Sequence, residues 1–193
     1  MTWLLVAVVA YFAISLTLSW LRAVELLTGT WDMGLYQQAL WSTAHGRAFY
    51  EAADAETGGY HSLLQVHTVF VFYLLAPLYA AFPFEATLLV LQSIVVAIAA
   101  IPLYLLGRDL SGSSRLALLT AVAYLVWTPT LSSNLYDFHP EAFLPLEIFT
   151  IVLLWERERF AVGALAVAAA FATFELAPVL IFFVAVFFLV PSR

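Results

Sequence analysis

The stretch ATLLVLQSIVVAIAAIPLYLL at residues 86–106 decides the fold class of this chain. An α-helix rises about 1.5 Å per residue, so roughly 20 apolar residues cross the ~30 Å hydrocarbon core of a membrane. The stretch meets that length and contains no acidic or basic side chain. It therefore predicts a transmembrane helix.

The composition of the whole chain supports the same reading. Hydrophobic residues make up 64% of the 193 residues and charged residues 10%, whereas a soluble domain is about half apolar and a quarter charged. This excludes a cytosolic globular enzyme and a disordered chain. The absence of cysteine excludes disulfides, thiolate chemistry and Cys-ligated zinc. The net charge of −6 offers no basic face, so no nucleic-acid partner is predicted.

Several further apolar segments predict an all-α, polytopic transmembrane helical bundle that forms a single membrane domain over residues 1–193, with the lipid bilayer as its partner. About six hydrophobic helices are expected to cross. The predicted helices are 3–21, 63–82, 86–106, 116–132, 142–155, 160–174 and 176–190, and an outer amphipathic juxtamembrane segment covers 22–61.

The arginines predict the orientation, because basic residues favour the cytoplasmic side. If the N-terminus is cytoplasmic and every segment crosses, the loop at 107–115 falls outside. One segment must then fail to cross, and we expect this of 63–82, which contains Pro77 and stops at Pro83. As a re-entrant or interfacial segment it would leave five arginines inside, those of the loops at 107–115 and 156–159 and the one at the end of the chain. In the alternative topology all segments cross, and the arginines of the 107–115 loop lie outside as an exception to the rule that basic residues favour the cytoplasmic side. The arginines concerned are Arg108, Arg115, Arg157, Arg159 and Arg193.

The first polar cluster is WDMGLYQQALW at residues 31–41. Read as a helix, it is amphipathic and would lie on the outer interface with Trp31 and Trp41 as anchors. Asp32 stands at its start, where a carboxylate suits the helix dipole. Asp32 is therefore either a helix cap or a cavity carboxylate that acts as general base or metal ligand.

The second cluster is NLYDFHPE at residues 134–141, which places Asp137, His139 and Glu141 within five residues. Pro140 favours an extended His139 and can open the next helix. Carboxylates that flank an imidazole can bind a hard divalent cation such as Mg²⁺ or Mn²⁺, or share a proton. The alternative is a polar turn between helices.

Two further positions stand out in apolar surroundings. His67 could face the same cavity as Asp32, or be a hydrogen-bonded interfacial side chain. Glu175 interrupts the longest apolar stretch three residues before Pro178. It marks either a helix boundary or a cavity carboxylate, because acidic groups at membrane depth are costly and face a protein interior.

As a set these clusters resemble a family of bacterial and archaeal membrane proteins catalogued as domain of unknown function 2079. The resemblance rests on a D-x-G-x-x-x-Q-x-x-W pattern that runs from Asp32 to Trp41, on His67 followed by LAPLY at 75–79, and on Gln92 followed by IPLY at 101–104 and YDFHP at 136–140. It implies an integral protein of the plasma (inner) membrane of a prokaryote.

That family is similar to the C-type glycosyltransferases, which take a sugar from a polyprenyl-phosphate carrier at the extracytoplasmic face. The resemblance implies a catalytic or metal-binding carboxylate at Asp32 and a second one at Asp137. We expect His139 to contact the donor phosphate. Further substrate-binding positions are His67, Gln38 and Glu141. Members of that superfamily have about twice as many helices, so the chain resembles their N-terminal part.

The expected function is that of a membrane glycosyltransferase-like protein that uses a lipid-linked sugar. One rival is a transporter or flippase component, with Glu175, Gln92 and His67 along one path through the bundle. The other is a non-catalytic scaffold subunit. An enzyme would bring Asp32 and Asp137 to a cavity open to the outer face.

Overall fold

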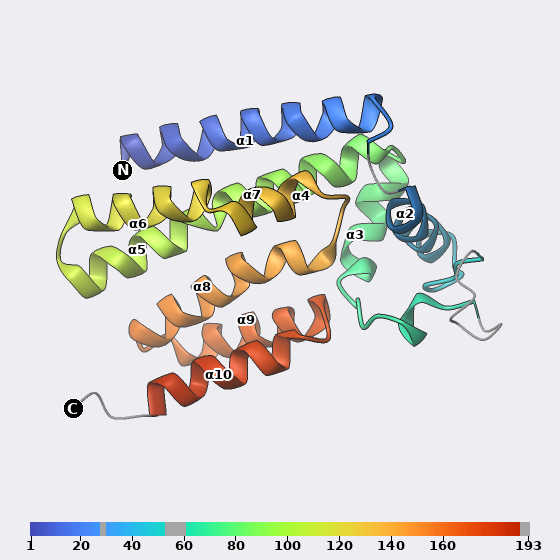
Figure 1. Ribbon diagram of the computed structural model, residues 1–193. Coiled ribbons are helices and arrows are strands. Elements are labelled where there is room, and N and C mark those ends of the chain that lie inside the picture. Colours follow the sequence, from blue (N-terminus) through green and yellow to red (C-terminus); the bar gives the residue numbers. More distant parts are fainter. Residues whose placement is uncertain (28–29, 53–60, 190–193) are drawn as a thin grey trace.

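The computed structural model describes residues 1–27, 30–52 and 61–189, and in these ranges the fold is all-α (Figure 1). The helices are labelled α1 to α10, with two short 3-10 helices, η2 and η3. The described residues contain no β-sheet and one isolated bridge between Tyr50 and Ser62. Arg193, predicted to be cytoplasmic, and the last residue of the helix predicted at 176–190 lie outside the described residues. The all-α prediction is confirmed.

Among the residues that the structure describes, two helices are long and apolar enough to cross a membrane. The first is α1 (Thr2–Val24), with 23 residues, and the second is the continuous 27-residue segment Glu85–Ser111 formed by α4 (Glu85–Ile98) and α5 (Ala100–Ser111). The interruption at Ala99 has a chemical cause: Pro102 has no N–H to donate to the carbonyl four residues earlier.

The segment predicted as a helix at 116–132 is divided into two helices in the structure. α6 (Ser114–Val126) and α7 (Thr128–Leu135) meet at an angle of 45°. Between them Trp127 is extended, with φ −66° and ψ 131°. Pro129 stands in the first turn of α7, where its missing N–H is tolerated. Counted as one broken span, the pair raises the candidate spans to three.

The C-terminal helices are shorter than the expected crossings. α8 (Leu144–Glu156), α9 (Phe160–Thr173) and α10 (Ala177–Leu189) have 13, 14 and 13 residues, which gives each a length of about 20 Å. About six crossing helices are expected from the sequence, and within the described residues two or three helices have the length and composition of a membrane span.

The segment predicted as one helix at 63–82 is also divided. It begins with η2 (Leu63–Gln65), continues without helix, and ends in α3 (Phe72–Ala81), which has ten residues and Pro77 inside it. The helix predicted at 142–155 likewise starts with a 3-10 turn, η3 (Pro140–Phe143), before α8. Pro77 lies inside α3, whereas Pro140 and Pro145 stand in the first turns of η3 and α8, where the missing N–H is tolerated.

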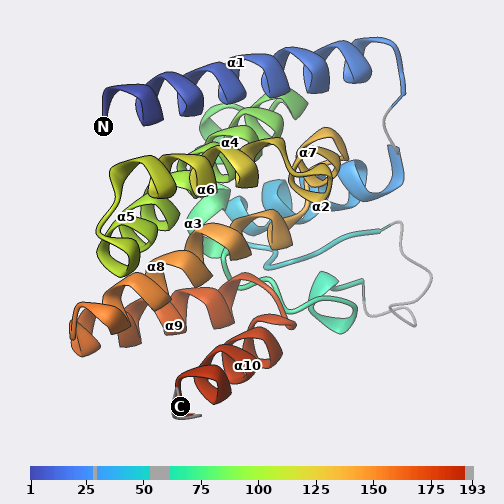
Figure 2. The same cartoon turned by 60° about the vertical axis from the view of Figure 1, so that its left-hand side comes forward.

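The helices give the molecule two chemically different ends. In Figure 1 the N-terminus, the α5–α6 turn and the α8–α9 turn lie at one end, while α2 (Thr30–Ala44) and α3 lie across the other. Figure 2 shows the same separation from a second direction. The first end, which we call the arginine end, carries Arg108, Arg115, Arg157 and Arg159. We call the opposite end the α2 end.

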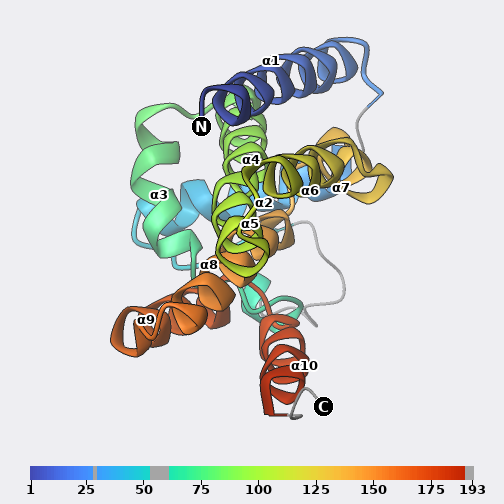
Figure 3. The same ribbon diagram turned by 90° about the vertical axis from the view of Figure 1, so that its left-hand side faces the viewer.

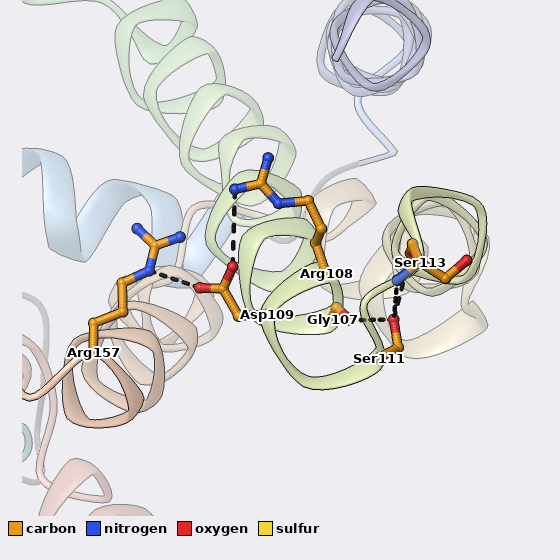
Figure 4. Close-up of polar contacts among 6 residues, drawn as sticks. All are labelled: Gly107, Arg108, Asp109, Ser111, Ser113 and Arg157. Atoms are coloured by element: carbon orange, nitrogen blue, oxygen red, sulfur yellow. Dashed lines mark hydrogen bonds and ion pairs between the residues drawn. The ribbon is translucent and has the colours of Figure 1, made fainter.

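A polar network at the arginine end joins α5 to the α8–α9 turn (Figure 4). Arg157 Nε donates to Asp109 Oδ2 at 2.7 Å, and Arg108 Nη2 lies 3.8 Å from Asp109 Oδ1. Just beyond, Gly112 adopts a left-handed conformation with φ 65° and ends α5, as glycine does without strain. The Ser113 side chain then caps α6. This tight turn places α5 and α6 side by side.

Small side chains form much of the bundle interior. Figure 3, seen from the arginine end, shows α4, α5 and α6 in the middle, α1 above them, and α9 and α10 below. Alanine lets neighbouring helix backbones approach closely. The fully or almost fully buried alanines of this central layer are Ala97, Ala99, Ala100, Ala117 and Ala121.

Candidate functional site

One side of the candidate site is α2, which lies at the α2 end with one face buried. Asp32 is in its first turn, where the helix dipole favours a carboxylate, and its side chain is 37% exposed. Trp31 and Trp41 are exposed and suit a membrane–water interface. The buried face consists of Met33, Leu35, Tyr36, Ala39 and Leu40.

The opposite side of the site is the turn between α7 and η3. His139 is extended there, with φ −138° and ψ 129°, because the following Pro140 disfavours the helical conformation. His139 Nδ1 lies 2.9 Å from the backbone carbonyl of Asp137. A carbonyl oxygen only accepts, so Nδ1 carries a proton. Nε2 then points to Asp32, whose Oδ2 atom is 3.6 Å away.

Gln92 of α4 holds this turn in place from inside the bundle. Its Oε1 accepts a hydrogen bond from His139 N at 2.8 Å, and the residue is fully buried. Its Nε2 lies within 3.2 to 3.4 Å of four backbone carbonyls of the turn. A buried amide that meets backbone groups in this way fixes their conformation. The carbonyls belong to Ser133, Asn134, Tyr136 and Asp137.

The other two acidic residues of this turn lie deeper than Asp32. Asp137 is 1% exposed. Glu141, in the first turn of η3, is partly buried, and its Oε2 atom has no hydrogen-bond partner among the described residues. Glu141 also lines a cavity of about 360 Å³ with otherwise mostly apolar walls, which include Val96, Tyr124, Leu144, Phe149 and Leu180.

His67 and Glu175 form a second acid–imidazole pair. His67 Nδ1 donates to Glu175 Oε1 at 2.9 Å, and Thr68 N donates to Glu175 Oε2 at 2.9 Å. Partial burial acts to raise the pKa of the Glu175 carboxyl group, but the hydrogen bonds from His67 and from backbone N–H groups outweigh it and hold that pKa below its ordinary value. Glu175 lies at the α9–α10 junction and fixes segment 67–68 there.

Tyr36 stands between the two pairs. Its ring centroid lies 5.6 Å from that of His139 and 6.5 Å from that of His67. Burial raises the pKa of the Tyr36 hydroxyl, and the negative charges of Glu141, Asp32 and Glu175 raise it further. The hydroxyl therefore remains protonated, and its surroundings are acidic. The amphipathic pattern of residues 31–41 assigned Tyr36 no separate role.

Gln38, predicted to bind substrate, has a structural partner. Its Oε1 accepts a hydrogen bond from Ala52 N at 2.9 Å, which ties the segment after α2 back to that helix. The structure thus brings together Asp32 with His139, and His67 with Glu175, while Gln38 contacts a loop. The sequence marked Gln92 as a polar residue in the apolar stretch at 86–106 and as part of the family pattern, but not as the side chain that holds the turn before η3.

The side chains of the site do not fit a metal centre held by the protein. Mg²⁺ and Mn²⁺ prefer about six oxygen ligands. Within the described ranges, no three His, Asp or Glu side chains come close enough together to hold a metal ion. Asp32, which together with Asp137 was predicted to bind the metal, is at ion-pair distance from His139. We therefore assign no step to a metal.

Long apolar helices and a polar site at one end define an α-helical membrane protein. The chain belongs to the DUF2079 family of predicted membrane proteins, whose family model matches residues 22–192. This confirms the family resemblance in the sequence motifs. Neither the curated proteins nor the solved structures contain a significant match to the chain.

Proposed function

We propose that this protein is a C-type glycosyltransferase-like membrane protein that uses a sugar linked to a polyprenyl phosphate. The observation that carries the proposal is the Asp32–His139 pair. A carboxylate and an imidazole, supplied by α2 and by the α7–η3 turn, lie 3.6 Å apart. Both side chains keep contact with solvent, at 37% and 18% exposure, so a substrate can reach them.

The two ends of the molecule support an extracytoplasmic location for this pair. Basic residues favour the cytoplasmic side of a membrane, and four arginines gather at the arginine end. Asp32 and His139 belong to the α2 end, where α2 and α3 lie across the helices (Figure 1). In the proposed orientation the N-terminus would lie in the cytoplasm and the pair at the outer face of the plasma membrane.

The reaction would be a displacement at the anomeric carbon of the sugar. An acceptor hydroxyl oxygen forms the new bond to that carbon while the bond from the carbon to the phosphate oxygen breaks. The electron pair leaves with the lipid phosphate, and the hydroxyl proton goes to the Asp32 carboxylate as general base. His139, whose Nε2 atom lies 3.6 Å from Asp32 Oδ2, would contact the leaving phosphate.

The cavity beside η3 supports a lipid substrate. Its apolar walls offer a hydrocarbon chain an environment from which water is excluded, and its volume is about 360 Å³. Glu141 lines this cavity and is two residues from His139. A lipid tail in the cavity would therefore hold its headgroup close to the candidate site.

A transporter would need polar groups distributed along a path through the bundle. Gln92, one of the three residues expected on such a path, is engaged by the backbone of the 133–139 turn. The other two, His67 and Glu175, pair with each other beside Tyr36. All three residues thus have partners within or beside the candidate site rather than along a path through the bundle, which favours an enzyme over a transporter.

The test is a transfer assay on the purified protein in lipid nanodiscs with a mixture of polyprenyl-phosphate-linked sugars. Release of the free polyprenyl phosphate, measured by mass spectrometry, reports transfer or hydrolysis without knowledge of the acceptor. We expect Asp32→Asn to lower the rate by about 100-fold or more, the usual effect of losing a general base. Glu25→Gln removes another exposed carboxylate just before α2 and serves as the matched control. Equal rates for Asp32→Asn and the unmodified protein would refute the proposal.

A further inference from the structure

The His67–Glu175 pair has a geometry that the proposed reaction does not use. Glu175 receives two hydrogen bonds, one from His67 Nδ1 and one from Thr68 N, each 2.9 Å long. A third contact, from Val71 N to the Ala172 carbonyl at 2.7 Å, fixes the same two segments to each other. The His67 imidazole therefore has one defined position against the α9–α10 junction.

The position of Glu175 decides which ring nitrogen of His67 is available. The lowered pKa of Glu175 keeps it ionised at neutral pH, and an ionised carboxylate only accepts hydrogen bonds. Nδ1 of His67 must then carry the proton, which leaves Nε2 of the neutral ring as an acceptor. Within the described ranges Nε2 has no hydrogen-bond partner, and the His67 side chain is 31% exposed.

The ring of His67 lies among aromatic side chains next to the candidate site. It packs on Phe174, with ring centroids 5.5 Å apart, and it shares Tyr36 with His139. The titratable groups that face this region are Glu175 from the α9–α10 junction and Tyr36 from α2. Asp32 and Glu141 act on Tyr36 electrostatically. No arginine takes part in the hydrogen bonds or ion pairs described for this cluster.

We propose that His67 is a ligand-binding residue whose Nε2 atom accepts a hydrogen bond from a sugar or acceptor hydroxyl group, with Glu175 as its positioning residue. A hydroxyl donor suits this nitrogen better than an anion, because the surrounding charges are negative. The identity of the hydroxyl as part of a lipid-linked sugar rests on the proposed function. The assignment of Nε2 as the acceptor atom rests on the contacts of His67 alone.

The experiment is ¹⁵N NMR of the imidazole rings in the full chain, labelled at histidine and held in nanodiscs. The chain has four histidines, so each ring can be assigned by substitution. We expect the neutral His67 ring to carry its proton on Nδ1, and Glu175→Ala to move that proton toward Nε2. Glu156→Gln, an exposed carboxylate at the end of α8, is the control and should leave the tautomer unchanged. A wild-type His67 that carries its proton on Nε2 overturns the inference.

A second measurement tests the ligand. Octyl glucoside serves as the probe because it joins sugar hydroxyls to an apolar chain. We expect its addition to shift the Nε2 resonance of His67 saturably and to leave that of His45, near the end of α2, in place. In His67→Phe the ring is retained without nitrogen, and the affinity for the probe should fall about fivefold, the effect of one neutral hydrogen bond. An unchanged Nε2 resonance, or unchanged affinity in His67→Phe, contradicts the assignment. Because neither readout needs turnover, a failure of the transfer assay leaves both interpretable.

Discussion

Replacing Gln92 with leucine should uncouple the 133–139 turn from α4, because one buried amide supplies most of the polar contacts between them. The side chain is fully buried and accepts a hydrogen bond from His139 N. Leucine fills a similar volume but can neither accept nor donate. The backbone N–H of His139 then loses its partner, which costs about 1–3 kcal/mol for a buried group.

The amide nitrogen adds a second contribution. It has two N–H groups and lies within 3.4 Å of four carbonyls, so it can satisfy two of them at a time. Each neutral hydrogen bond contributes about 0.5–1.5 kcal/mol, and the added apolar surface of leucine offsets part of the loss. We expect Gln92→Leu to lower the free energy of unfolding by about 2–4 kcal/mol.

The matched control is Ser93→Ala at the next residue of the same helix. Ser93 is also fully buried and accepts one hydrogen bond, from Asn134 Nδ2 at 3.2 Å, so its loss should cost about 1 kcal/mol. Unfolding in detergent micelles by urea, followed by tryptophan fluorescence, gives both values, and hydrogen exchange reports the His139 amide directly. If Gln92→Leu is no less stable than Ser93→Ala and the His139 amide stays protected, Gln92 does not hold the turn.

Three further predictions concern other parts of the molecule. In Gln92→Glu the new carboxyl group faces the same backbone carbonyls, which favour its protonated form, so its pKa in the folded protein should be raised. The variant should therefore be most stable at low pH and lose stability as the pH rises through that pKa, as measured by urea unfolding. Glu175 has a lowered pKa, so its contribution to stability should be complete above its ordinary value of 4.5 and be lost as the pH falls through the lowered one. A protection factor of the Thr68 amide that falls in acid, measured against the intrinsic exchange rate at each pH, checks this, and Glu175→Gln should not show that fall. A Cβ atom at Gly107 would lie 3.3 Å from Ala117 Cα. Gly107→Val should therefore push α5 away from α6 and lower the free energy of unfolding in urea by about 1–3 kcal/mol. Gly107→Ala should cost less, because its clash is smaller and alanine gains about 1 kcal/mol of helix propensity over glycine.

The all-α membrane class could be predicted because it depends on local composition. The stretch at 86–106 is apolar over the length of a bilayer core, and the structure contains a 27-residue candidate span over it. The positions at which the helices are interrupted were harder to predict. Pro129 lies within the helix predicted at 116–132, and whether a proline bends a helix or opens a new one depends on the packing around it.

The partners within the site depend on tertiary contacts that no local pattern contains. The sequence singled out Asp32, His139, His67 and Glu175 because each is polar in apolar surroundings. It could not pair them, since His67 and Glu175 meet only after the α9–α10 junction packs on the segment before α3. The sequence did not identify Tyr36 as a site residue, because a buried tyrosine fits the helical pattern of apolar positions as any other apolar residue does.

The most direct test is whether positions 32 and 139 are neighbours at one end of the protein. The chain contains no cysteine, so Asp32→Cys combined with His139→Cys gives two thiols without background. We predict that dibromobimane, a short thiol cross-linker, joins them efficiently in nanodiscs, because the native side chains approach to 3.6 Å. Asp32→Cys combined with Arg157→Cys, at opposite ends of the molecule, should give no cross-link. Failure of the first pair to react, or efficient cross-linking of the second, would contradict the site.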